Sequence, residues 1–270
     1  MKIYEYRVIV PVNIEKYHIG HRYMNLEYVK DESGNGEGIE LVKNEKYTKG
    51  NESGQYTYKI FHVKSKIPSF IRWAIPDKYL HFHEESWNAF PHYYTVDFIP
   101  AMGDNFLLHV ESQHIPYKSD MEFPENALNL PKEDLEKRKI YYCDIVDGLP
   151  HDKKLDLEGF SCPEANITKL TGKSGSFKHD QVPEWTKNYK GDMVCCIKVV
   201  KFHFHWGGLQ KSVESMLTKK SYPKIFTESH RKLISTAKDW YHLTEDDILR
   251  LETEAQEKQD GGKEFEKDEE

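Results

Sequence analysis

Several side chains that could bind an anion lie within strand-like runs of apolar and aromatic residues. They are Thr57, Lys59, Thr95, Ser112 and Lys198. Thr57 and Lys59 are two residues apart, so on a strand they share one face. If that face is buried, the lysine needs a negative partner, because an unpaired buried charge is costly. A phosphate ligand would supply the partner, as would a carboxylate of the last helix such as Glu252 or Glu254. If the face is exposed to solvent, neither is required.

Two His-x-His pairs could supply metal ligands. They are His81-Phe82-His83, which precedes Glu84 and Glu85, and His203-Phe204-His205. On a strand, residues i and i+2 share a face, so each pair could offer two imidazoles to a metal of a cupin-like oxygenase or hydrolase. A chain with 14 histidines also produces such pairs by chance. A histidine-based metalloenzyme therefore remains an alternative, and we expect no metal and no cofactor.

Other enzyme signatures are incomplete. Thr171-Gly172-Lys173-Ser174 resembles the end of a phosphate-binding loop, but the position that should hold the first glycine is Ile167. No Gly-x-Ser-x-Gly elbow occurs in a strand-to-helix setting. The four cysteines form no Cys-x-x-Cys motif, so we expect free thiols. The sequence assembles no set of nucleophile, base and orienting acid, and we expect a protein that is not an enzyme.

Two apolar features could contact a membrane. The segment Phe70 to Ile75, which contains Trp73, is short and is bounded by two prolines, so it is either a buried helix or an amphipathic lid that can open. Trp206 lies at the end of a predicted strand, just before two glycines. A tryptophan at such a corner either packs in the core or inserts its ring into a headgroup layer.

The elements that position these residues are mostly strands first and helices last. Runs of β-branched and aromatic residues, or alternating polarity, predict strands over Tyr4–Val12, Gly54–Lys64, His92–Phe98, Asn105–His114, Ile140–Val146 and Met193–Trp206. Helical spacing appears around Tyr17–Val29 and from Lys211 onward, and Thr244 with Asp247 predicts the N-cap of a last helix. The segment Leu149–Glu184 shows no period and is interpreted as an excursion over the surface. This order is typical of an α+β fold with an antiparallel sheet.

Composition excludes several classes of protein. The 270 residues are 38% apolar, 13% aromatic and 31% charged, with a formal net charge of −7, and the mean hydropathy is −0.77. No apolar run approaches the roughly 18 residues of a membrane-spanning helix, and the N-terminus lacks a signal-peptide pattern, so we expect a cytoplasmic protein. The acidic balance argues against binding nucleic acid or anchoring through a basic patch. Residues 261–270 are interpreted as an acidic, disordered tail after a single domain over residues 1–260.

Four motifs make the chain similar to a known family. They are GQYTYK (54–59), WNAFP (87–91), KFHFHWGGLQ (201–210) and LTEDDI (243–248). With the opening EYRVIVPV and the turn GNGEG, they resemble the phosphatidylinositol transfer proteins, in order, from about Tyr4 to Glu254. The chain looks like a single-domain, class I type member. The resemblance implies a START-like helix-grip fold, in which helices wrap a concave antiparallel sheet around one cavity for a whole phospholipid.

The resemblance also implies the site residues. The inositol ring would be held by Thr57, Lys59, Asn88 and Glu252, with Glu84 close by, and the phosphate by Thr95, Ser112 and Lys198. We therefore expect a monomeric carrier that binds one phosphatidylinositol or phosphatidylcholine and exchanges it during transient contact with a membrane surface. A lipid sensor that presents phosphatidylinositol to a kinase is the alternative.

Three positions depart from the family pattern. The family's pair of adjacent membrane-docking tryptophans aligns with Trp206-Gly207 here. We therefore expect membrane docking to depend more on Phe70 and Trp73. A glutamine associated with the phosphate of choline lipids aligns with His21. A reactive cysteine aligns with Tyr93, so thiol reagents should not block this protein there.

Overall fold

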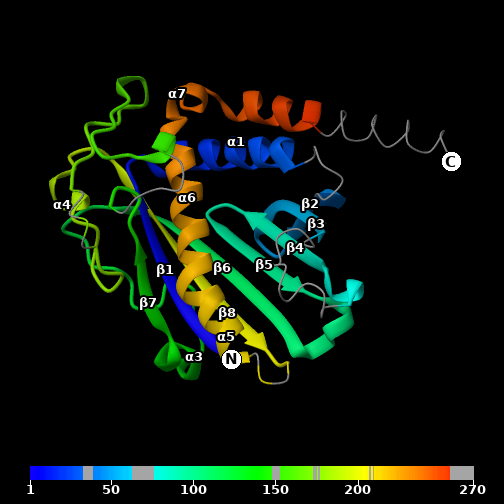
Figure 1. Cartoon of the computed structure of the whole chain (residues 1–270). Coiled ribbons are helices and arrows are strands. Elements are labelled where there is room, and N and C mark those ends of the chain that lie inside the picture. Colours follow the sequence, from blue (N-terminus) through cyan, green and yellow to red (C-terminus); the bar gives the residue numbers. More distant parts are fainter. Residues whose placement is uncertain are drawn as a thin grey trace.

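A computed structural model describes residues 1–32, 39–62, 76–147, 153–172, 175, 177–206, 208 and 210–255. One eight-stranded sheet crosses the molecule, with the strand order β2-β3-β4-β5-β6-β8-β1-β7 (Figure 1). The strands are β1 (Lys2–Val10), β2 (Ile39–Lys49), β3 (Glu52–His62), β4 (His81–Ala89), β5 (His92–Phe98), β6 (Phe106–Tyr117), β7 (Lys139–Cys143) and β8 (Met193–Phe204). With the helices below, they confirm the α+β prediction.

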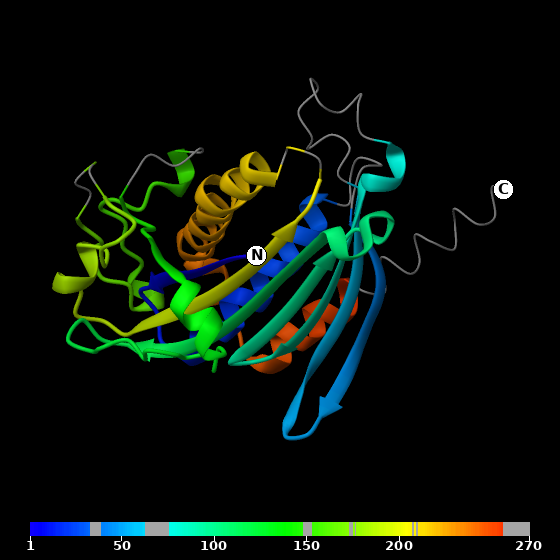
Figure 2. The same cartoon turned by 90° about the horizontal axis from the view of Figure 1, so that it is seen from below.

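The sheet is antiparallel except at one edge, where β7 pairs with β1 in parallel. A parallel pair needs a long connection, and here residues 118–138 carry the chain from β6 to the free edge of β1. At the opposite edge, β2 and β3 form a hairpin that projects from the rest of the sheet (Figure 2). The sheet is therefore mixed, with seven strands in an antiparallel arrangement and one parallel edge strand.

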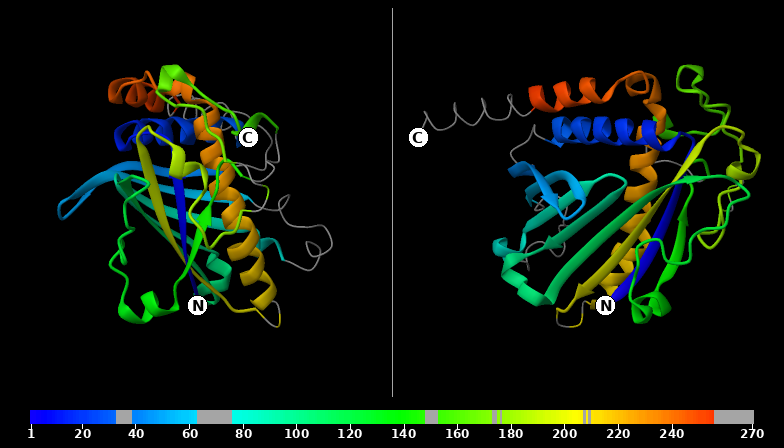
Figure 3. Two further views of the ribbon diagram at one scale, coloured as in Figure 1. Left: turned by 90° about the vertical axis from the view of Figure 1, so that its left-hand side faces the viewer. Right: turned by 180° about the vertical axis from the view of Figure 1, so that it is seen from behind.

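The main helices are α1 (Ile14–Glu32), α5 (Gln210–Met216), a π-helical turn (Leu217–Ser221), α6 (Tyr222–Ser235), α7 (Ala237–Trp240) and a last helix over residues 245–255. Short ones are α3 (Lys132–Lys137), α4 (Trp185–Asn188) and the 3₁₀ turns Asp77–Tyr79, Pro100–Asn105, Lys153–Leu155 and Pro163–Ala165. The last helix runs alongside α1 (Figure 3). None of the described helices is long and apolar enough to cross a membrane.

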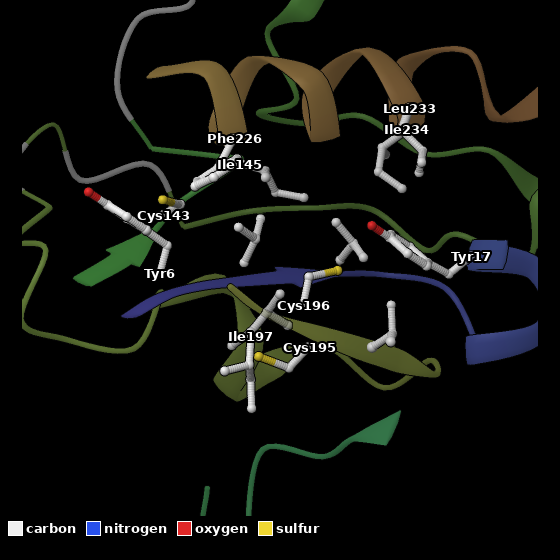
Figure 4. Packing of buried hydrophobic residues seen from close by; sticks show 14 of the residues in the cluster. Tyr6, Tyr17, Cys143, Ile145, Cys195, Cys196, Ile197, Phe226, Leu233 and Ile234 are labelled. Atoms are coloured by element: carbon white, nitrogen blue, oxygen red, sulfur yellow. The ribbon is translucent and has the colours of Figure 1, made fainter. Parts of the chain in front are cut away.

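The helices α1 and α6 cover the same face of the sheet. The rings of Tyr17 on α1 and His114 on β6 lie 5.0 Å apart, and those of Phe226 on α6 and Tyr6 on β1 lie 5.3 Å apart. Direct strand pairing places His114 and Tyr6 on one face of the sheet. Figure 4 shows side chains of α6 pointing toward β1 at this interface. We call this covered side the inner face.

Several expected elements are confirmed and three need correction. The strands β1, β3, β5, β6, β7 and β8 fall within one to three residues of the predicted bounds at most of their ends. The sequence did not predict β2 or β4. β2 is rich in charged residues and largely exposed, and β4 has polar residues on both faces, so neither shows a clear apolar period. The predicted surface excursion instead contributes Leu157, Ile167 and Leu170 to the core, each at most 1% exposed.

The predicted cap of the last helix is present as a reciprocal pair. The Thr244 backbone N–H donates to Asp247 at 3.0 Å, and the Asp247 backbone N–H donates to the Thr244 hydroxyl at 3.2 Å. The four cysteines are buried and free, as expected. The predicted acidic tail (261–270) lies outside the described residues.

Three histidines sit between α1, α6 and β6. His230 has a complete set of partners, because its Nδ1 donates to the Phe226 carbonyl at 2.7 Å and its Nε2 accepts from the Tyr17 hydroxyl at 3.1 Å. Burial, helped by the nearby Lys198 ammonium, lowers the pKa of His230 to about 3. The same two causes hold the pKa values of His21 and His114 well below the usual range. The folded protein thus keeps these imidazoles neutral.

We predict that acid destabilises the fold through His230. The unfolded chain takes up a proton near pH 6.5 and the folded chain only near pH 3, so stability is complete above about pH 7 and falls as the pH falls. Between pH 7.5 and 5 this single group should remove about 2 kcal/mol. Urea unfolding across that range should show a weaker pH dependence for His230→Gln than for the wild type, whereas the exposed His242→Gln variant should match the wild type. Equal slopes for all three proteins would contradict the assignment.

A second prediction concerns the contact between α1 and α7. A Cβ on Gly20 would lie 2.8 Å from three ring atoms of Trp240, which is fully buried and donates its indole N–H to the Leu233 carbonyl at 2.9 Å. Overpacking of this kind costs about 1–3 kcal/mol. We expect Gly20→Ala to lower the free energy of unfolding in urea despite the better helix propensity of alanine. Asn25→Ala, at an exposed position of the same helix, is the control and should not destabilise; unchanged stability of Gly20→Ala would refute the close-contact argument.

Candidate functional site

The strand register brings seven of the eight residues predicted to bind the headgroup onto the inner face. Directly paired residues of neighbouring strands point to the same side of a sheet. The first row contains Lys59, Glu84 and Asp97; the second contains Thr57, Ser86 and Thr95; the third contains Asn88, Tyr93, Ser112 and Lys198. Residues from five strands, separated by up to about half of the chain, thus form one polar surface.

In the first row, Lys59 is paired with a carboxylate. Its Nζ lies 3.1 Å from Oε1 of Glu84, and both side chains are half-buried. Of the partners considered from sequence, Glu252 instead accepts from Arg22 of α1 at 2.9 and 2.6 Å, and Glu254 is exposed. The structure therefore joins Lys59 to Glu84 and leaves Glu252, the eighth predicted residue, at the contact between α1 and the last helix.

Sequence reasoning missed Asp97, which lies directly opposite Glu84 on β5. Its side chain is buried, and its Oδ1 has no hydrogen-bond partner among the residues that the structure describes. Burial raises the pKa of Asp97 well above its usual range, the Glu84 charge raises it further, and Lys59 opposes the shift. An aspartate within an alternating strand could have signalled this position, had the inward face of β5 been known.

The second row consists of hydroxyl groups. The Ser86 and Thr95 hydroxyl oxygens are 2.9 Å apart, so they hydrogen-bond to each other across β4 and β5. Thr57 lies opposite Ser86, and in the described part of the chain its buried hydroxyl has no hydrogen-bond partner. A buried hydroxyl without a partner destabilises the protein by its desolvation cost, and a hydrogen bond to a ligand would offset that cost.

The third row contains a buried cation. Lys198 is 8% exposed, and its Nζ lies 3.5 Å from the Ser112 hydroxyl and 5.5 Å from the ring centre of Phe226. Burial lowers the pKa of Lys198. None of the ion pairs among the described residues includes it. Because a buried ammonium requires compensation, this position is suited to an anionic group.

Asn88 occupies the same row at the far edge of the site. It is half-buried on β4, and a Cβ on the paired strand at Gly54 would lie 2.1 Å from its backbone oxygen. Only glycine permits this approach of β3 to β4. Gly54 therefore helps to hold Asn88 near Thr57, which explains the glycine at the start of the GQYTYK motif.

The predicted docking residues are only partly visible. Trp206 is half-buried, and its ring packs 4.8 Å from Tyr79 and 6.5 Å from Phe204. Phe70 and Trp73 lie outside the described residues. Docking by these three side chains stays a prediction.

The His-x-His pairs do not form a metal centre in the described part of the chain. His83 lies on the outer face, where its Nδ1 is 2.6 Å from the Tyr58 hydroxyl, while Glu84 points to the inner face. No group of three His, Cys, Asp or Glu side chains that could hold a metal occurs among the described residues. The alternation of the strand separates the pair from Glu84, and Glu85 on the same face accepts from the Tyr56 hydroxyl at 3.0 Å.

Comparisons with known proteins agree with the geometry of the inner face. The family model described as phosphatidylinositol transfer protein matches residues 1–257. The chain is similar to the phosphatidylinositol transfer protein beta isoform of Bos taurus, with 37% identity over 94% of this chain and 92% of the relative. It is also similar to the human beta isoform (37%, the same shares) and to phosphatidylinositol transfer protein 1 of Dictyostelium discoideum (30%, over 95% and 94%). The chain therefore belongs to the phosphatidylinositol transfer protein family.

Proposed function

We propose that this protein is a non-enzymatic carrier that binds one phosphatidylinositol or phosphatidylcholine at the inner face and exchanges it between membranes. The observation that carries the proposal is the buried Lys198 beside Ser112, without a carboxylate among the described ion pairs. A phosphate diester, which both lipids contain, is an anion that fits this need. Charge-assisted hydrogen bonds from an ammonium to phosphate are among the strong ones.

The first two rows suit an inositol ring. An inositol headgroup offers five free hydroxyls, each able to donate and accept a hydrogen bond. Lys59 and Asn88 supply donors, Glu84 supplies acceptors, and Thr57 supplies a hydroxyl that has no partner in the described structure. The esterified choline of phosphatidylcholine has no free hydroxyl, so it would leave these groups without ligand partners. Such a difference is how a hydrogen-bonding site discriminates between ligands.

An apolar area on the same face supports shielding of the acyl chains. The rings of Phe61, Phe82 and Phe106 follow one another across the sheet at 6.1 and 5.6 Å, and Phe202 lies 5.8 Å from Phe106. Each CH₂ group moved out of water contributes about 0.8 kcal/mol. A lipid would leave a bilayer at a useful rate only if the protein replaced that apolar environment.

The last helix is suited to act as a movable cover. It contacts α1 through Arg22, which pairs with Glu245 and Glu252 near the surface. Partly exposed ion pairs of this kind contribute little to stability and weaken with salt. We propose that this helix opens when Trp206 and the segment containing Phe70 and Trp73 contact a bilayer, and that the protein acts as a cytoplasmic monomer.

Transfer of labelled lipids between vesicles, with no kinase present, tests the function. A carrier moves both phosphatidylinositol and phosphatidylcholine, whereas a sensor that only presents phosphatidylinositol to a kinase gives no net transfer. Native mass spectrometry of the purified protein should also detect one bound phospholipid. Absence of both transfer and bound lipid would reject the proposed function.

Substitutions should separate the headgroup from the phosphate. We expect Lys59→Ala and Asn88→Ala to reduce phosphatidylinositol transfer about tenfold or more, since each removes a ligand hydrogen bond worth roughly 1–3 kcal/mol, while phosphatidylcholine transfer survives. Lys198→Met should reduce transfer of both lipids, because both contain the phosphate. The exposed Lys46→Ala on β2 is the matched control and should behave as the wild type. Equal loss of both lipids in Lys59→Ala and Asn88→Ala would rule out the headgroup assignment.

A further inference from the structure

Asp97 occupies a place in the site that neither the motifs nor the predicted headgroup set includes. It extends the first row by one strand, from Lys59 on β3 through Glu84 on β4 to β5. On the next strand, β6, the paired residue is the apolar Leu108, which is 2% exposed. The acid therefore lies at the boundary between the polar rows and the apolar part of the inner face.

The surroundings of Asp97 leave its carboxyl without a counter-charge of its own. Lys59 already binds Glu84 at 3.1 Å. Tyr222 on α6 faces both acids. Burial raises the pKa of the Tyr222 hydroxyl, and the charges of Asp97 and Glu84 raise it further. These are the titratable groups facing Asp97 from β3, β4 and α6. The buried Asp97 and the half-buried Glu84 share one cation and cannot both ionise at low cost, so one keeps its proton.

We propose that Asp97 is a specificity residue that hydrogen-bonds a hydroxyl of a polyhydroxylated lipid headgroup as a neutral carboxylic acid. The inference rests on the proposed function and adds a residue to its headgroup site. Within the described structure, Oδ1 of Asp97 has no partner although the side chain is 95% buried. A buried carboxyl that the fold leaves unsatisfied is destabilising, which a ligand partner would offset.

The chemistry of the neutral acid matches a sugar-like ring. A protonated carboxyl has one O–H donor and retains acceptor capacity, and a hydroxyl can pair with either function. Glu84, which pairs with Lys59 at 3.1 Å, offers acceptors to a ligand, and Asp97 adds an O–H donor. Choline offers neither a donor nor an acceptor to this position. Asp97 should therefore raise affinity for the hydroxyl-bearing lipid alone.

Two variants test the proposal in vesicle transfer of labelled phosphatidylinositol and phosphatidylcholine at pH 7. Asp97→Val removes both hydrogen-bonding functions at similar volume, and we expect the ratio of phosphatidylinositol to phosphatidylcholine transfer to fall about tenfold. Asp97→Asn keeps a donor and an acceptor and should retain most of the ratio. Asp104→Asn, at an exposed position of the Pro100–Asn105 turn, is the matched control.

A stability measurement distinguishes specificity from a structural role. Since Oδ1 of the buried carboxyl has no partner in the described structure, Asp97→Val should unfold in urea at the same or higher concentration than the wild type. An unchanged lipid ratio in Asp97→Val, or equal loss of both lipids, would overturn the inference. Failure of the wild type to carry either lipid would instead reject the proposed function itself.

Discussion

A buried ammonium that needs an anion is the constraint around which the site is arranged. Lys198 lies on β8, between β6 and β1, and the residue is only 8% exposed. Ser112 on β6 supplies a hydroxyl 3.5 Å away, and Phe226 on α6 supplies a ring face 5.5 Å away. Neither neutralises the charge. The same ammonium helps to keep His21, His114 and His230 neutral, so one cation influences both the ligand site and the packing of α1 and α6 against the sheet.

The two sides of the molecule differ in how strongly they are held. Strands β1 and β8 are almost entirely buried and pair over nine residues, which makes this part a rigid platform. The last helix contacts α1 partly through Arg22 and two glutamates near the surface. Under the function proposed above, the platform holds the headgroup surface fixed, and the last helix, which also buries Ile248, is the element that moves. A carrier needs both, because it must recognise a lipid in water and release it at a membrane.

Much of the architecture was predictable because strands with one or two buried faces show their period in sequence. The runs that became β5 and β8 are aromatic or β-branched, and the Thr244–Asp247 cap uses a local reciprocal pattern. Prediction failed for β2, whose exposed residues carry no apolar period, and for Leu157, Ile167 and Leu170, whose irregular segment hides that it packs in the core. Periodicity predicts which face of a helix or strand is buried. It cannot identify isolated residues of an irregular segment that pack in the core.

The sequence by itself determined the family and, through the resemblance, predicted that Lys59, Asn88 and Lys198 belong to one site. Only the tertiary structure decided the pairings. Strand register placed Glu84 rather than Glu252 beside Lys59 and added Asp97 to the same row. Residues on three strands come together only after the pairing and the orientation of each strand are set. A shift of one residue would turn every one of these side chains to the outer face, so the site is a property of register as much as of residue type.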